Sequence, residues 1–195
     1  MSTAGSDPPG EAVRRISEAA RNQGRALNLS GLGLTAVPDS VRQLVGLARL
    51  DVSENWLSEV PDWIGQLTSF TTLNLRGNEL TAVPDSIGQL AGLTELWLGS
   101  NLLAAVPDPV RQLTGLTMLY LRGNELTAVP DWIGELADLT ELYLDENQLT
   151  EVPDSVGRLT GLTVLGLARN QLIEVPDSIG SLTNLTRLFL WVQLF

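Results

Sequence analysis

The apolar positions of this chain recur with a period of 23 residues. One unit, residues 116–138, reads LTMLYLRGNELTAVPDWIGELAD, and its residues 118–122, MLYLR, have leucine at every second position. Alternation with a period of two is typical of a half-buried β-strand. A Val-Pro-Asp tripeptide follows in every unit, with its proline at Pro38, Pro61, Pro84, Pro107, Pro130, Pro153 and Pro176. Seven copies at constant spacing predict a solenoid of stacked units, each with one short strand.

The unit has the pattern LxxLxLxxNxLxxVPxxIxxLxx, which resembles the leucine-rich repeats, specifically the 23-residue class of bacterial repeat proteins and of Ras-group and Roco-type repeat regions. The resemblance covers residues 24–195. It implies an α/β solenoid, a right-handed horseshoe with a concave parallel β-sheet, convex 3-10 or short helical turns and an N-terminal cap helix.

An asparagine recurs at the point where the chain must turn out of each strand. Its amide offers two donors and an acceptor to backbone groups that would otherwise be buried without partners. The resemblance implies a structural asparagine ladder inside the solenoid, formed by Asn55, Asn78, Asn101, Asn124, Asn147 and Asn170. The first unit departs from the pattern, with Leu32 in the asparagine position.

We expect three regions: a disordered tail over residues 1–10, a cap helix over 11–23, and a solenoid over 24–195 with seven full repeats and a partial eighth. In the helix, Val13, Ile16, Ala19 and Ala20 have helical spacing, so we expect them to cover the first coil. Gly24 follows as a stop signal.

The aspartate after each proline is predicted to cap a short helical turn. This set comprises Asp39, Asp62, Asp85, Asp108, Asp131, Asp154 and Asp177. An acidic stripe that binds calcium is the alternative, although one carboxylate per coil lacks the six to eight clustered oxygens that calcium prefers. No metal site is therefore expected.

The exposed positions of the strands carry the candidate binding site. The fifth position of three consecutive units holds Trp97, Tyr120 and Tyr143, which would form a row across adjacent strands. The neighbouring exposed positions hold Arg76, Arg122, Asp145, Glu95, Met118 and Glu141. Trp, Tyr and Arg are enriched where proteins bind one another, so we predict a protein-binding concave face. Packing of aromatic pairs for sheet stability alone is the alternative.

Aromatic and apolar residues also lie outside this row. Trp56, Trp63 and Trp132 are predicted to pack over neighbouring coils. At the C-terminus no polar capping segment follows the last strand. An exposed apolar end predicts self-association as a homodimer through Trp191, Leu194 and Phe195. The alternatives are that the last strand tolerates exposure to solvent or that the natural chain continues beyond it.

Composition narrows the function. The net charge is −11 and all twelve basic residues are arginine, which disfavours nucleic acid as a partner. The chain has neither cysteine nor histidine, so a Ser-His-Asp triad and the common transition-metal sites are excluded. No signal peptide or membrane span is recognisable, so a cytoplasmic protein is expected.

These observations predict a non-catalytic protein-protein interaction module that binds a protein partner and needs no cofactor. A sensing or regulatory portion of a larger signalling enzyme, such as a Roco-type GTPase, is one alternative. A structural or designed consensus array is another, because the 23-residue spacing is uninterrupted.

Overall fold

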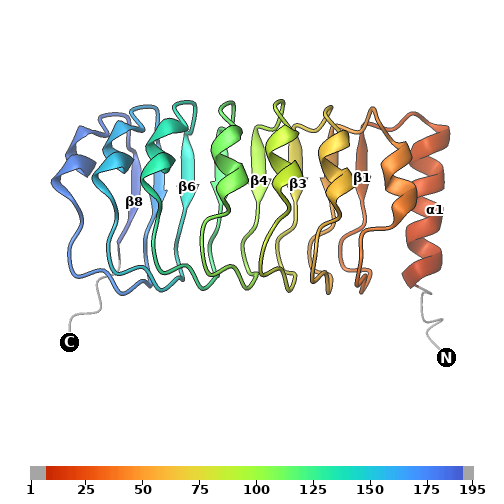
Figure 1. The fold of residues 1–195 in the computed structure, drawn as a ribbon, viewed down its shortest axis with the longest axis horizontal. Helices are drawn as coiled ribbons and strands as arrows, with labels where there is room; N and C mark the ends of the chain where they lie inside the picture. Colours follow the sequence, from red (N-terminus) through yellow and green to blue (C-terminus); the bar gives the residue numbers. More distant parts are fainter. Residues whose placement is uncertain (1–7, 191–195) are drawn as a thin grey trace.

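The computed structural model describes residues 8–190, which form a row of stacked coils preceded by one helix (Figure 1). The helix, α1, spans Pro8–Arg21. Within the described range, eight strands form one parallel sheet in chain order. They are β1 Ala26–Asn28, β2 Arg49–Asp51, β3 Thr72–Asn74, β4 Glu95–Trp97, β5 Met118–Tyr120, β6 Glu141–Tyr143, β7 Val164–Gly166 and β8 Arg187–Phe189. The α/β solenoid expected from the repeat is confirmed.

A 3-10 helix lies on the opposite side of each of the first seven coils (Figure 1). These are η1 Asp39–Gln43, η2 Asp62–Gln66, η3 Asp85–Gln89, η4 Asp108–Gln112, η5 Asp131–Glu135, η6 Asp154–Arg158 and η7 Asp177–Ser181. Proline precedes each one in an extended conformation, and its carbonyl closes the first turn, as where Val41 N donates to Pro38 O at 3.0 Å. The fixed φ of proline therefore sets the start of every convex turn.

The strand register follows the repeat, because each strand residue pairs with the residue 23 positions later, as Leu50 does with Leu73. The central leucines of β1 to β7 point inward and are buried. Together with the other apolar positions of the pattern they form one continuous core that extends from Ala12 to Leu182. The sheet therefore presents only its first and third residues on the concave face.

Buried asparagine amides connect neighbouring coils. Asn101 Nδ2 donates to the carbonyls of Leu75, Leu98 and Gly99 at 3.1, 3.0 and 3.3 Å, and its Oδ1 accepts from Leu80 N at 3.1 Å. The other five asparagines of the set bond in the same way, each to the coil before its own. Backbone groups at the end of each strand are thereby satisfied without water.

The predicted capping role of the aspartates is wrong. Proline occupies the N-cap position of all seven 3-10 helices, and none has a side-chain cap bond. The aspartate is the first residue of the helix, one position after the N-cap, which is the position from which a side chain can accept a hydrogen bond from the first free backbone N–H groups. Asp39 and Asp108 instead accept hydrogen bonds from indole nitrogens of the following coil.

The cap helix covers the first coil with a different face from the one predicted. It begins at Pro8, three residues before the expected start, and its buried residues are Ala12 and Ile16. Val13 is 60% exposed and Ala20 is also exposed, so both were placed wrongly in the buried face. Ala12 and Ile16 are four residues apart and therefore lie one above the other on the side that meets β1.

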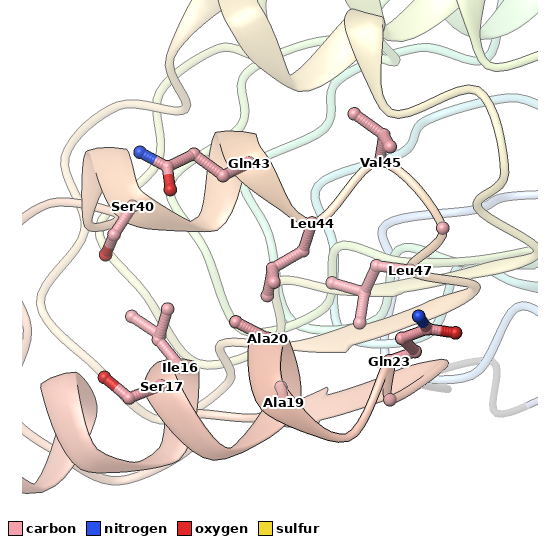
Figure 2. Close-up of a pocket in the computed structure, with 12 residues that line it drawn as sticks. Ile16, Ser17, Ala19, Ala20, Gln23, Ser40, Gln43, Leu44, Val45 and Leu47 are labelled. Atoms are coloured by element: carbon pink, nitrogen blue, oxygen red, sulfur yellow. The ribbon is translucent and has the colours of Figure 1, made fainter.

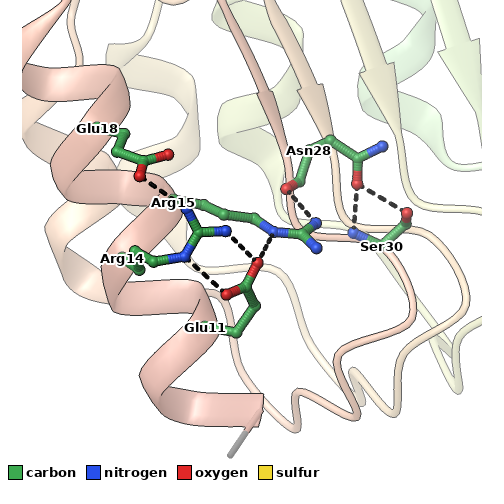
Figure 3. Close-up of polar contacts among 6 residues, drawn as sticks. All are labelled: Glu11, Arg14, Arg15, Glu18, Asn28 and Ser30. Carbon is green, nitrogen blue, oxygen red and sulfur yellow. Dashed lines mark hydrogen bonds and ion pairs between the residues drawn. The ribbon is translucent and has the colours of Figure 1, made fainter. Parts of the chain in front are cut away.

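A charged network ties the helix to the first strand (Figure 3). Glu11 accepts hydrogen bonds from Arg14 Nε at 2.9 Å and from Arg15 Nε at 2.6 Å. These bonds, first that from Arg14 and then that from Arg15, lower the pKa of Glu11 to about 2. Arg15 Nη1 also donates to the carbonyl of Asn28 in β1 at 3.0 Å. The helix is thus anchored through side chains as well as through its apolar face.

Candidate functional site: an aromatic row on the concave face

Trp97, Tyr120 and Tyr143 end the adjacent strands β4, β5 and β6 in register, and we call them the aromatic row. The ring centroids of Trp97 and Tyr120 are 5.1 Å apart with the planes at 29°, and those of Tyr120 and Tyr143 are 5.0 Å apart at 44°. All three side chains are half-buried. The repeat therefore produces a continuous aromatic surface that keeps ring area accessible.

A glycine allows the rings to lie close to the sheet. A Cβ at Gly99 would lie 2.5 Å from Cε1 of Tyr120, so any side chain there would displace the ring. Gly99 is buried beneath that ring. The position belongs to the seventh slot of its unit, where the other described coils carry serine, arginine, aspartate or alanine. Its contribution was not predicted, because it depends on a contact between residues 21 positions apart.

Glu95, Met118 and Glu141 form a second column beside the row, at the first positions of the same three strands. All are half-buried. Glu141 Oε2 accepts from the Tyr143 hydroxyl at 2.7 Å, and Glu95 Oε2 lies 3.5 Å from Trp97 Nε1. Burial and then the Glu141 bond raise the pKa of Tyr143 to about 12, so this hydroxyl is a donor across the neutral pH range.

Asp145 is buried, with 8% exposed, although the sequence placed it on the accessible surface. The next strand has Gly166 beside Tyr143, and a Cβ there would lie 2.0 Å from Asp145 Oδ2. The carboxylate therefore folds over Gly166, and its Oδ1 accepts from Ala168 N at 3.1 Å. Burial raises the pKa of Asp145 above its ordinary value of 3.8. Asp145 therefore lies mostly covered at the side of the site, and little of it is open to a partner.

The two arginines predicted for the site are exposed, but each has an acidic neighbour. Arg122 Nη2 lies 2.9 Å from Glu146 Oε1, and Arg169 bonds to the same carboxylate. Arg76 Nη1 lies 3.2 Å from Glu54 Oε1. The bonds of Glu146 lower its own pKa and raise that of Arg122. Neither Glu54 nor Glu146 was predicted, because each follows the slots that the repeat marks as exposed strand positions.

A hollow of about 400 Å³ opens at the C-terminal end of the row. It is bounded by Tyr120, Arg122, Tyr143, Asp145, Ala168, Arg169 and Phe189. Gly166 leaves room for it, because β7 has no side chain between the rings of Tyr143 and Phe189. The aromatic row thus leads into a recess edged by two arginines.

A second hollow, of about 510 Å³, lies between the C-terminal half of α1 and the first coil (Figure 2). Ile16 and Leu47 point into it from opposite sides, and Val45 lies at its edge. Its lining contains polar side chains such as Gln23 and Gln43 but no charged residue. It offers no group that would orient a ligand by charge.

The remaining tryptophans differ in their surroundings. Trp63 and Trp132 pack against the core on the convex side, as predicted. Their indole nitrogens donate to Asp39 Oδ1 at 3.2 Å and Asp108 Oδ1 at 3.3 Å. Trp56 is 61% exposed, so the prediction that it packs over a neighbouring coil is wrong. Its slot lies in the loop after the strand, where other coils carry glycine, glutamate, leucine or glutamine.

The residues predicted for self-association, Trp191, Leu194 and Phe195, lie outside the described residues. In β8, Leu188 occupies a core slot but is 39% exposed, and Phe189 is 45% exposed.

Two further properties of the described chain bear on function. Residues 8–190 contain no group of three or more acidic side chains placed to hold a metal ion. Over the same range, no helix combines the length and apolar character needed to cross a membrane.

The family model described as leucine rich repeat matches residues 69–126, 91–149 and 137–191, together more than half of the chain. No curated protein matches the chain. Among solved structures, a leucine-rich-repeat protein of Leptospira interrogans has a TM-score of 0.82 and 39% identity, covering 87% of this chain and 44% of that one.

Two other structures are similar. The leucine-rich-repeat ectodomain of the Arabidopsis thaliana receptor kinase GASSHO1/SCHENGEN3, in complex with Casparian strip integrity factor 2, has a TM-score of 0.69 and 31% identity, covering 85% of this chain and 24% of that one. An internalin, InlF of Listeria monocytogenes, shares the fold at a TM-score of 0.60 and 20% identity, covering 88% of this chain and 63% of that one. The chain spans less than half the length of the Leptospira and Arabidopsis proteins.

Proposed function

Because this chain belongs to the leucine-rich repeat family, we propose that it is a non-catalytic module that binds a protein partner across its concave face. The aromatic row carries the proposal. Three adjacent rings with centroids 5.1 and 5.0 Å apart, each half-buried, give a large contact area that loses little side-chain entropy on binding. The arginines at the edge add donors of the kind enriched in protein interfaces.

The rigidity of the frame supports the same function. The row rises from a parallel sheet whose register is constant from β1 to β8. The core slots are leucine in nearly every coil, whereas the exposed slots differ from coil to coil. A fixed frame with a varied surface suits recognition, because the binding groups are held in place before the partner arrives.

The comparisons are consistent with a binding role. The Arabidopsis ectodomain, 31% identical over the shared coils, was solved in complex with Casparian strip integrity factor 2. The family match indicates no enzymatic class. The absence of histidine and cysteine from the sequence also removes the usual nucleophile and base pairs. Recognition is therefore the function that the surface supports best.

Affinity capture from a lysate of the source organism tests the proposal. The intact protein is compared with a Trp97→Ala, Tyr120→Ala, Tyr143→Ala variant, and bound proteins are identified by mass spectrometry. A Trp56→Ala, Leu102→Ala variant is the matched control, because both side chains are exposed and lie outside the strands. We expect a protein that the intact chain and the control retain and the triple variant loses. Equal recovery by all three folded proteins would show that the row serves sheet packing alone.

A further inference from the structure

We propose that the concave face takes a basic protein segment, whose arginine or lysine side chains lie beside Glu95 and Glu141 and against the aromatic row. This inference rests on the proposed function, since it specifies the partner of the same surface. It follows from the charges that the face leaves uncompensated, from the aromatic rings beside them, and from the distance between the two carboxylates.

Glu95 and Glu141 differ from the other carboxylates around the row. Glu54 and Glu146 are ion-paired with arginines. Glu95 and Glu141 take part in none of the ion pairs formed within residues 8–190. Each has an Oε2 directed at a ring of the row, while its Oε1 has no hydrogen-bond partner in the same range. Both carboxylates can therefore accept a cation from outside.

The nearest basic residues in the same column do not neutralise this pair. Arg49 on β2 lies two strands before Glu95, and Arg187 on β8 lies two strands after Glu141. Two strand spacings amount to about 10 Å, well beyond direct ion-pair distance. The column is consequently negative at its centre and positive at its ends, which favours a segment whose positive charges are central.

The aromatic row strengthens the preference for a long basic side chain. The Tyr143 hydroxyl is held against Glu141, and the Trp97 ring edge faces Glu95, so each carboxylate lies beside a ring. The aliphatic stem of a lysine or arginine whose charge reaches either carboxylate can therefore pack along the aromatic row. Met118 lies between the two carboxylates and offers an apolar floor for the aliphatic stem of lysine or arginine.

The spacing of the carboxylates sets a pattern for the segment. Glu95 and Glu141 stand on β4 and β6, about 10 Å apart across the sheet. A segment in the polyproline II conformation rises about 3.1 Å per residue with three residues per turn, so side chains three positions apart point the same way and lie about 9 Å apart. A segment that crosses the strands with two basic residues separated by two others would engage both sites. The net charge of −11 adds long-range attraction for such a partner.

A display library of random short peptides, selected against the immobilised full-length chain, provides the first test. We expect enrichment of peptides with two arginines or lysines three positions apart, whose binding is lost in the triple alanine variant of the row. Peptides that need the row but lack basic residues would overturn this inference and leave the proposed function intact. If no selected peptide depends on the row, both proposals fail.

Titration calorimetry with a selected basic peptide then tests whether Glu95 and Glu141 bind its positive charges. A Glu95→Gln, Glu141→Gln variant keeps an acceptor oxygen for each ring and removes both charges. A Glu79→Gln, Glu125→Gln variant is the matched control, since these two exposed glutamates are also two repeats apart but lie outside the strands. We expect Kd to weaken about tenfold in the first variant and less than about twofold in the second. If both variants bound the peptide equally weakly, the effect would come from net charge alone, and the assignment of Glu95 and Glu141 as the binding groups would be wrong.

Discussion

At the scale of single residues, the buried asparagines contribute most clearly to the fold. Each has its amide in a position where backbone donors and acceptors of two coils meet, and Asn101 alone makes four hydrogen bonds. Leu32 stands in this slot in the first coil, where no earlier coil has carbonyls to be satisfied. The asparagine is needed wherever one coil follows another, which explains its regular recurrence.

Replacing Asn101 by alanine should therefore lower the free energy of unfolding by about 2–4 kcal/mol, because it leaves several buried backbone groups without partners. Asn74 is the matched control, since its half-buried side chain on the concave face accepts a single bond, from Arg76 N at 3.1 Å. Asn74→Ala should cost less than about 1 kcal/mol. Chemical denaturation of both variants measures the difference, and similar losses would contradict a special role for the ladder.

The accessibility of single concave residues could be predicted only in part from the sequence. Strand alternation correctly placed Trp97, Tyr120 and Tyr143 on the face, because that pattern depends on local geometry. Asp145 was misplaced, because its burial depends on the missing side chain of Gly166, one coil later. Exposure in a parallel sheet is decided by cross-strand neighbours, so each slot must be read together with both the same slot and the neighbouring slots of the adjacent coils.

At the scale of elements, the contact between successive 3-10 helices on the convex side differs from coil to coil. Three of the six interfaces between η1 and η7 bring a glycine against a serine of the next coil, as where a Cβ at Gly134 would lie 2.3 Å from the carbonyl oxygen of Ser155. At two others the corresponding positions hold arginine and tryptophan: Arg42 and Trp63, and Arg111 and Trp132. The helices η1 and η2, and likewise η4 and η5, touch less extensively than their neighbours. The size of this residue pair sets the local spacing.

A double-mutant cycle at Arg111 and Trp132 tests this explanation. Trp132→Ser alone should destabilise the protein by about 1–3 kcal/mol, because it leaves a gap beside the core and removes the bond to Asp108. Adding Arg111→Gly rebuilds the close glycine-serine contact, so we expect a favourable coupling of about 1 kcal/mol.

The control combines Arg111→Gly with Trp63→Ser, which belong to different interfaces and should add within about 0.5 kcal/mol. The free energies come from chemical denaturation of all variants. Simple additivity at the η4–η5 interface would mean that spacing is set by other contacts.

The cap helix shows where sequence periodicity loses information about an element. Helical spacing predicted the helix, but it assigned the larger Val13 to the buried face in place of Ala12. Ala12 shares its face with Ile16, four residues later, whereas Val13 lies one position further round the helix and is exposed. Which of these two stripes is buried depends on the partner surface, which hydrophobicity along the helix does not specify.

At the scale of the whole molecule, the sheet and the core extend in one dimension. Each strand pairs only with the strands of the adjacent coils, from β1 to β8. Stability in such an array is a sum of coil and interface contributions, so a local change is felt mainly by nearby coils. The N-terminal helix closes this array with Ala12 and Ile16, which belong to the same continuous core as the coils.

Weakening this cap should therefore loosen the first coils and leave distant coils unaffected. Ile16→Ala removes a side chain that is only 4% exposed and should destabilise the N-terminal end by about 2–4 kcal/mol. Val13→Ala on the same helix is the control, because Val13 is 60% exposed. Hydrogen exchange followed by mass spectrometry should show faster exchange in β1 and β2 for Ile16→Ala only, with β6 and β7 unchanged. A uniform loss of protection along the chain would instead indicate a single cooperative unit, in which no coil opens before the rest.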